Sequence, residues 1–284
     1  MKLVSYSYNE KPHYGILTDN GIIDLSTRLG QQFSDLKALI AGGALHRAQD
    51  YIAMKPDFTA EEVKYLPVIT HPDKILCVGM NYADKRAEFN QTDPAPTLFV
   101  RFPDSQTGHR GPLVKPAITH EFDYEGELAV IIGKDGAHIK QENALSHVAG
   151  YSCYMDGSVG DWQHSWFTAG KNWPKTGGFG PSLTTTDKIP DPENLTISTW
   201  LNGNRVQHDN TGNLIHKIPE LITYISMFTE LSAGDVIITG SPGGVGKKRV
   251  PPLFMKAGDC IEVEIENISR LTNFIVDEIV QNDE

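Results

Sequence analysis

Short apolar runs separated by turn residues make up most of this chain, and they predict more strands than helices. In the first 70 residues, apolar alternation predicts strands over 4–8, 13–18 and 21–25, and helical spacing covers 35–44 and 45–54. Further on, buried strands are predicted over 74–79, 128–132, 149–156, 236–239, 260–265 and 271–279, with a helix over 218–229. Most connections are hairpins, such as the one at Asn202-Gly203. The pattern therefore predicts a mainly β protein with some α structure, in the α+β class, whose strands run mostly antiparallel.

The same pattern divides the chain into two parts. Residues 1–70 form a small unit of strands and helices in which no side chains assemble into a site, so packing or a dimer contact is its expected role. Residues 71–284 form the larger domain. Within it, residues 90–119 are rich in proline and glycine and predict a long loop. Apolar residues in this loop favour an ordered lid, spanning about 83–110, over disorder.

Four acidic residues precede the strand predicted over 128–132. Glu121, Asp123, Glu125 and Glu127 occupy alternate positions, so an extended backbone would place all four carboxylates on one face. Like charges at this spacing repel one another, and a hard divalent cation would bind them because carboxylate oxygens are its preferred ligands. The alternative is a solvated acidic strand end, which is the commoner meaning of a run of charges.

Charge and composition argue against several classes of function. The formal net charge is −11 and no basic block is present, which argues against a nucleic-acid surface. No stretch approaches the ~20 apolar residues of a membrane span, and the N-terminus lacks the apolar segment of a signal peptide. Cys77, Cys153 and Cys260 form no CxxC motif and fit a reducing compartment, so a cytoplasmic protein is expected.

Three further segments carry groups that could take part in chemistry. Asp156 ends a predicted strand and could complete a metal site, although an N-cap or an Asx turn is the commoner role of such a residue. Lys171 could bind an enolate or carboxylate oxygen or act as a base, although most lysines are simply exposed. Residues 239–246 could offer N–H groups and hydroxyls to an oxyanion, but they do not form a P-loop and could equally be a plain turn.

Taken together, these segments resemble one family. In chain order the motifs are CVGMNYAD at 77–84, DYEGELAVIIG at 123–133, MDGSVGDWQ at 155–163, GKN at 170–172, GFGP at 178–181, TGSPGGVG at 239–246, PP at 251–252 and KAGD at 256–259. This order, over about residues 72–276, resembles the fumarylacetoacetate hydrolase superfamily in its small-protein branch. The resemblance implies a mixed β-sandwich roll of the fumarylacetoacetase C-terminal type, preceded here by the small N-terminal α/β unit. It also implies a homodimer with Mg²⁺, Mn²⁺ or Ca²⁺ in the site.

The resemblance assigns the metal and substrate positions. Glu125, Glu127 and Asp156 match the metal ligands, whereas Glu121 and Asp123 do not match ligand positions. Lys171 matches a lysine that contacts the substrate oxyanion.

The substrate-binding loop of the family corresponds to the motif at 239–246. Gly240 and Ser241 are therefore expected to bind substrate, with Ser241 in place of a common threonine. Tyr82 of the first motif is assigned to substrate binding as well.

Two positions depart from the family pattern near the catalytic step. Lys85 stands where the family has a histidine that, with a glutamate, orients or deprotonates the attacking water. The glutamate is kept as Glu88, at helical i, i+3 spacing. Gly160 stands where the family has an arginine. A lysine is normally protonated and makes a poor base, so the change shifts weight toward reactions that need no attacking water.

The sequence predicts a divalent-metal-dependent hydrolase that cleaves a C–C bond in a small anionic diketo acid of the acylpyruvate type, through a metal-stabilised enolate. Glu88, Lys171 and Lys85 are its catalytic candidates. In one alternative, the same site acts as a decarboxylase, or as a keto–enol isomerase or lyase, on oxaloacetate-like 2-oxo acids. In a second alternative, the chain is a catalytically degenerate relative that keeps the fold and the metal.

Overall fold

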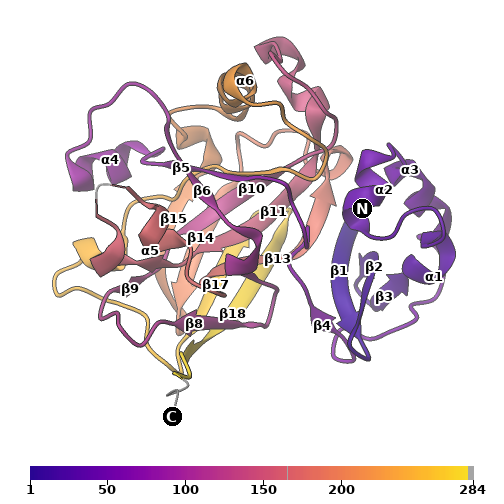
Figure 1. Cartoon of the computed structure of the whole chain (residues 1–284), viewed down its shortest axis with the longest axis horizontal. Coiled ribbons are helices and arrows are strands. Elements are labelled where there is room, and N and C mark those ends of the chain that lie inside the picture. The colour runs from indigo at the N-terminus through magenta and orange to yellow at the C-terminus, as the bar shows by residue number, and fades with distance from the viewer. Residues whose placement is uncertain (165, 281–284) are drawn as a thin grey trace.

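A large mixed sheet with a smaller sheet packed on it forms the framework in the computed structural model, which describes residues 1–164 and 166–280 (Figure 1). The eleven-stranded sheet has the order β3-β2-β1-β13-β11-β10-β16-β5-β6, with β4 paired to β1 and β7 to β13. Its strands are β1 Lys2–Tyr8, β2 Lys11–Thr18, β3 Gly21–Asp24, β4 Lys64–Tyr65, β5 Ile75–Gly79, β6 Thr97–Arg101, β7 Gln106–Thr107, β10 Gly126–Ile132, β11 Val148–Asp156, β13 Gly177–Thr185 and β16 Val236–Ile238.

The smaller sheet has five strands in the order β15-β14-β17-β18-β8. Its strands are β8 Pro112–Lys115, β14 Thr196–Leu201, β15 Asn204–Asn210, β17 Cys260–Ile265 and β18 Ser269–Asp277, and a separate ladder pairs β9 Phe122–Asp123 with β12 Ser158–Val159. The α-helices are α1 Ser26–Leu29, α2 Leu36–Ala41, α3 Leu45–Ala48, α4 Ala83–Phe89, α5 Thr168–Lys171 and α6 Ile218–Phe228. None of the helices that the structure describes is long and apolar enough to cross a membrane.

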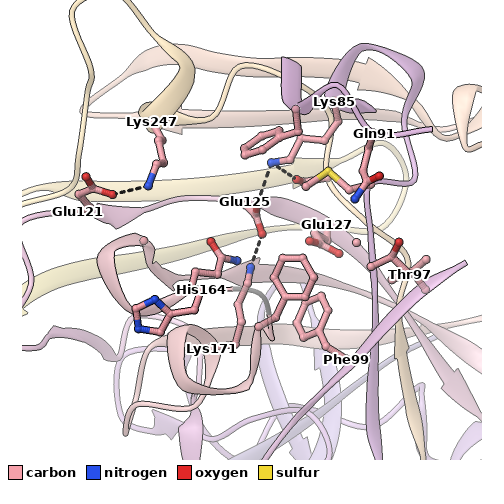
Figure 2. A pocket seen from close by; sticks show the side chains of 18 of the residues that line it. Lys85, Gln91, Thr97, Phe99, Glu121, Glu125, Glu127, His164, Lys171 and Lys247 are labelled. Atoms are coloured by element: carbon pink, nitrogen blue, oxygen red, sulfur yellow. Dashed lines mark hydrogen bonds and ion pairs between the residues drawn. The ribbon is translucent and has the colours of Figure 1, made fainter. Parts of the chain in front are cut away.

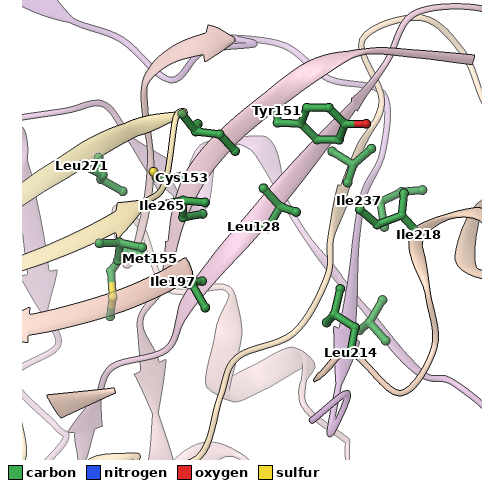
Figure 3. Packing of buried hydrophobic residues seen from close by; sticks show 14 of the residues in the cluster. Leu128, Tyr151, Cys153, Met155, Ile197, Leu214, Ile218, Ile237, Ile265 and Leu271 are labelled. Atoms are coloured by element: carbon green, nitrogen blue, oxygen red, sulfur yellow. The ribbon is translucent and has the colours of Figure 1, made fainter. Parts of the chain in front are cut away.

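Strand β10 is buried on both faces, which explains why its sequence is apolar without alternation. Leu128 and Val130 belong to the core between the two sheets, whereas Ala129 and Ile131 belong to the core on the opposite face. Figure 3 shows the first of these cores, where Leu128 lies near Ile197 of β14 and the other apolar side chains of the smaller sheet. The position of β10 is therefore fixed from both sides, and with it the acidic residues at its start.

Residues 1–70 form a lobe at one edge of the molecule, drawn in indigo in Figure 1. This lobe is joined to the main sheet because β1 pairs with β13, with Leu3 opposite Leu183. Its helix α2 contributes Leu39 and Ile40 to the core that also holds Ile131 of β10. The expected packing role of this unit agrees with these contacts, and the boundary near residue 70 stays a prediction.

The predicted α+β class with mostly antiparallel strands is confirmed, since β7, β5 and β8 make the parallel pairings and the other ladders are antiparallel. The prediction of one long loop over 90–119 is wrong. Strand β6 pairs antiparallel with β5, with Thr97 opposite Gly79 and Arg101 opposite Ile75. Strands β7 and β8 follow β6 along the chain. Frequent prolines and glycines concealed these short strands, and β6 belongs to the sheet rather than to a lid.

Candidate active site

Three carboxylates from two neighbouring strands meet at one end of the large sheet. β10 and β11 pair antiparallel with Gly126 opposite Met155, which brings the residues on either side of Gly126 close to Asp156. The backbone N–H of Asp156 donates to the carbonyl of Glu125 at 2.8 Å. Ligand atoms of Glu125, Glu127 and Asp156 all lie within 4.8 Å of one another. Strand register thus brings together the three residues, called the triad below, that the resemblance assigned to a metal.

The four alternating acids do not share one face, because the strand is interrupted. β9 ends at Asp123 and β10 begins at Gly126. Glu121 pairs with Lys247, whose Nζ lies 2.7 Å from the carboxylate. Asp123 accepts the backbone N–H groups of Gly246 and Lys247 at 2.7 and 2.8 Å. Glu121 and Asp123 therefore have partners outside the triad.

Burial and neighbouring charges give Glu125 and Glu127 unequal proton affinities. Burial raises the pKa of Glu127 well above its usual range, and the negative charges of Asp156 and Glu125 raise it further. Burial would also raise the pKa of Glu125, but the ammonium groups of Lys171 and Lys85 outweigh it and lower that pKa to about 2. Clustered carboxylates form the all-oxygen donor set that Mg²⁺, Mn²⁺ and Ca²⁺ prefer, and the raised pKa of Glu127 reports a repulsion that a cation would relieve. The residues present fit a divalent cation.

Lys171 and Arg101 occupy the buried side of the triad. Lys171 Nζ donates to Asp156 Oδ2 at 2.7 Å, to Ser158 Oγ at 2.6 Å and to Glu125 Oε2, which accounts for the three donors of an ammonium group. Burial would lower the pKa of Lys171, but Asp156 and Glu125 outweigh it and raise that pKa, so the group stays charged. Arg101, at the end of β6, is 2% exposed and donates to Asp156 Oδ1. The lysine expected to hold a substrate oxyanion is thus fully engaged with the protein.

Lys85 approaches Glu125 from the side opposite to Lys171 (Figure 2). It lies on α4, is 3% exposed and lines the cavity. Its Nζ lies 2.7 Å from Glu125 Oε1, and its other hydrogen bond within the described part of the chain is a long one of 3.5 Å to Ser241 Oγ. An ammonium group has three donors, so Lys85 keeps donor capacity for a ligand.

Besides Asp156, three predicted site residues do not line the cavity. Glu88 Oε1 accepts the backbone N–H of Gly244 at 2.7 Å. Tyr82 is fully buried in the hydrophobic core, where its hydroxyl has no partner among the residues that the structure describes. The N–H of Gly240 donates to Glu127 Oε2 at 2.6 Å, so it is not free for an oxyanion. Ser241, by contrast, lines the cavity.

Glu125 and Glu127 of the triad line a cavity of about 720 Å³, within the size range that holds small-molecule ligands, whereas Asp156 is fully buried and is not among the lining residues. Figure 2 shows Lys247 and Glu121 on one side of Glu125, and Phe99 and Thr97 on the other. The cavity is lined by the charged and hydroxyl groups of Lys85, Glu121, Glu125, Glu127, Lys171, Ser241 and Lys247, by the apolar side chains of Val78, Met80, Phe89, Phe99 and Phe167, and by polar groups that include Gln91, Asp93, Thr97, Asp161, Gln163 and His164.

Comparison with known proteins agrees with this geometry. The family model described as "Fumarylacetoacetate (FAA) hydrolase C-terminal" matches residues 74–276. The chain belongs to the fumarylacetoacetate hydrolase family. The human protein "Oxaloacetate tautomerase FAHD2A, mitochondrial" is 39% identical over 276 residues, which cover 93% of this chain and 88% of that protein.

Two solved structures match nearly the whole chain. Fumarylacetoacetate hydrolase (EaFAH) from psychrophilic Exiguobacterium antarcticum superposes with a TM-score of 0.84 at 32% identity, covering 98% of this chain and 100% of the other. Maleylpyruvate hydrolase from Sphingobium sp. SYK-6, in complex with manganese (II) ion and pyruvate, gives a TM-score of 0.79 at 27% identity, covering 98% and 99%. The predicted family and fold are confirmed.

These relatives of the fumarylacetoacetate hydrolase family are named as enzymes, and both a tautomerase and hydrolases occur among them. They support the conclusion that this chain is an enzyme of the family. Which reaction it catalyses has to be argued from the site itself. The manganese ion of one relative supports a divalent cation, without selecting Mg²⁺.

Three residues of the site were missed from the sequence. Arg101 lay inside the predicted loop, although the preceding apolar residues 98–100 are a strand signal. Ser158 lay in a recognised motif, and only its contact with Lys171 reveals its role. His164 lines the cavity, and no spacing in the sequence indicates this.

Proposed function

We propose that this protein is a divalent-cation-dependent keto–enol tautomerase of an oxaloacetate-like 2-oxo acid. The observation that carries the proposal is the contrast between Lys85 and Glu88. Lys85 lines the cavity as a hydrogen-bond donor, whereas Glu88, the expected water-activating base, is bonded to Gly244 outside it. Hydrolysis needs an activated water, whereas tautomerisation moves one proton from C3 to the oxygen of the 2-oxo group, and His164, which lines the cavity, is a group that can accept that proton and return it. The likeness to an oxaloacetate tautomerase supports the same reaction.

The side chains at the triad have separate roles in this proposal. A cation held by Glu125, Glu127 and Asp156 would supply the Lewis acidity that polarises the 2-oxo group. The Ser241 hydroxyl donates a hydrogen bond to a substrate oxygen, and Lys85 provides a second donor.

The other groups at the site support this arrangement. Lys171 and Arg101 hold the Asp156 carboxylate in position. Phe99 and Phe167, whose ring centres lie 5.2 Å apart, form an apolar wall that limits the access of water.

Hydrolysis of an acylpyruvate is the second candidate, because the cavity contains an imidazole that could also act as a base toward water. His164 lines it, and Figure 2 shows the ring on the same side of Glu125 as Lys171. An imidazole there could assist an attacking water. The two solved relatives described above are named as hydrolases.

Exchange of the C3 hydrogens of oxaloacetate with D₂O, followed by NMR, tests the proposal. We expect rapid exchange with Mg²⁺ or Mn²⁺ and none above background with EDTA. Release of pyruvate from oxaloacetate, and cleavage of an acylpyruvate, are measured in parallel and should be slower. A higher kcat/KM for acylpyruvate cleavage than for exchange would make the protein a hydrolase, and no cation-dependent turnover of either acid would contradict both candidates.

A further inference from the structure

Lys85 and Lys171 both bond to Glu125, but their remaining donors differ. Lys171 donates to Glu125, Asp156 and Ser158, and these three acceptors occupy all of its N–H groups. Within the described residues, Lys85 has one short contact, to Glu125 at 2.7 Å, and one long contact of 3.5 Å to Ser241. The Phe89 ring, whose centre lies 5.2 Å from Lys85 Nζ, supplies no carboxylate or carbonyl acceptor, so this ammonium, only 3% exposed, keeps unused donors at the cavity and is placed to bind an anionic ligand.

The charge around the triad also calls for such a ligand. Three carboxylates are matched there by three cations, namely Lys85, Lys171 and Arg101, each within hydrogen-bond distance of a triad oxygen. A divalent cation would therefore leave the group with two positive charges. Within this bonded group, a 2-oxo dicarboxylate would balance both charges, whereas a 2-oxo monocarboxylate would balance one of them. Three other acids that line the cavity are more exposed than the triad and lie outside the bonded group, namely Asp93, Glu121 and Asp161.

Among the residues that the structure describes, the other walls of the cavity offer no second buried ammonium group with unused donors. Phe99 and Phe167 are apolar. Lys247 also lines the cavity, but its side chain is 46% exposed and already lies 2.7 Å from Glu121. Lys85 is only 3% exposed, so its attraction for an anion is screened far less by water and salt.

We infer that Lys85 binds the distal carboxylate of a 2-oxo dicarboxylic acid and thereby selects dicarboxylic over monocarboxylic substrates. The inference rests on the proposed function, because it takes the 2-oxo group to lie at the triad. In this inference Lys85 does not activate water. Its ammonium group instead attracts the carboxylate at the far end of the substrate.

A matched pair of acids tests the inference. Oxaloacetate and 2-oxobutanoate share a four-carbon chain and differ in a carboxylate or a methyl group at C4, and both can exchange C3 hydrogens in D₂O. The ratio of their kcat/KM values for cation-dependent exchange should fall about 10- to 100-fold in Lys85→Met, the loss expected for a hydrogen bond between charged groups. Lys85→Arg should retain more of the ratio. Lys247→Met, which removes a lysine equally close to a glutamate, should leave the ratio unchanged.

Binding of unreactive analogues provides a readout that is independent of turnover. Calorimetry in the presence of Mg²⁺ should show that the native protein binds malate more tightly than 2-hydroxybutanoate, and that Lys85→Met loses this preference. An unchanged preference in Lys85→Met, or its loss in Lys247→Met alone, would overturn the inference. If the native protein exchanges neither acid, the proposed function fails, while the calorimetric preference still decides the role of Lys85.

Discussion

The two sides of Glu125 are built differently, although each presents a lysine to it. On the closed side, Lys171 and Arg101 share the carboxylate of Asp156, and Lys171, although it lines the cavity, has all three donors bonded to the protein. On the open side, Lys85 and Ser241 line the cavity and are only loosely bonded to each other, at 3.5 Å. Under the proposed function, the closed side would hold the ligands of a cation in place, and the open side would be free to contact what the cation binds.

The strands and helices explain this difference. The closed side is formed by β6, β11 and the end of α5, and β6 and β11 both belong to the large sheet. The open side comes from α4 and from the loop after β16, which contribute Lys85 and Ser241 to the lining of the cavity. A fully bonded network on a sheet is rigid, whereas a short helix and a loop can vary between relatives without disturbing the metal ligands.

The largest effect should follow removal of the Arg101 guanidinium. Arg101→Met leaves the Asp156 carboxylate, which is 0% exposed, without one of its two cationic partners. Breaking a buried pair on one side costs about 3–5 kcal/mol, so we expect a fall of this size in the free energy of unfolding by urea. Lys247→Met is the control, because it breaks a half-exposed pair worth at most about 1 kcal/mol. Equal losses in the two variants would show that the closed side is no more constrained than the rim.

The next effect concerns pH and the cation. The pKa of Glu127 is raised in the folded protein, so that its carboxyl holds a proton more tightly than in the unfolded chain. Without a cation, stability should therefore fall as pH rises from the ordinary value of 4.5 through the raised pKa. A cation displaces the proton, so its stabilising effect should grow with pH, reaching about 2.7 kcal/mol at a hundred times Kd.

Thermal unfolding between about pH 5 and 8, with Mg²⁺ or with EDTA, measures this dependence. Glu127→Gln has no proton to lose and should abolish both the pH dependence and most of the stabilisation. If Mg²⁺ stabilises the native protein equally across this range, proton release from Glu127 is not coupled to cation binding.

The closed side was only partly predictable from the sequence. The triad could be predicted because Glu125 and Glu127 flank a strand start and Asp156 ends the next strand, so that motif order and antiparallel pairing bring them together. The position of Arg101 could not be predicted, because it lies on an edge strand within a segment whose many prolines and glycines led to the prediction of a loop.

The open side was misjudged in a different way. Residue type and spacing placed Lys85, Glu88 and Tyr82 on one segment. They did not predict the directions in which these side chains point. Backbone geometry turns Tyr82 into the core and Glu88 toward Gly244, and leaves Lys85 at the cavity. Long-range partners decide these directions, and a local pattern carries no information about them.

The smallest effect, and the sharpest test of the open side, concerns Glu88. Its Oε1 accepts the N–H of Gly244, a bond that the amide oxygen of glutamine can also accept. Glu88→Gln should therefore keep cation-dependent exchange of oxaloacetate within about threefold of the native rate, since less than about 1 kcal/mol is at stake. Glu88→Ala leaves that N–H without its acceptor and should lose more, through a shift of the loop that carries Ser241. Rates are measured at saturating Mg²⁺, and the fold is checked by circular dichroism.

A general base would respond in the opposite way to the same pair of variants. If Glu88 removes the substrate proton or activates water, Glu88→Gln loses the base and should fall by about 10²- to 10⁴-fold, as far as Glu88→Ala. Equal and large losses in both variants would place Glu88 among the catalytic groups and make the open side a centre of proton transfer. A small loss of activity in Glu88→Gln and a larger one in Glu88→Ala would mean that Glu88 supports the loop that carries Ser241. Lys85 would then be the charged group of α4 that contacts the substrate.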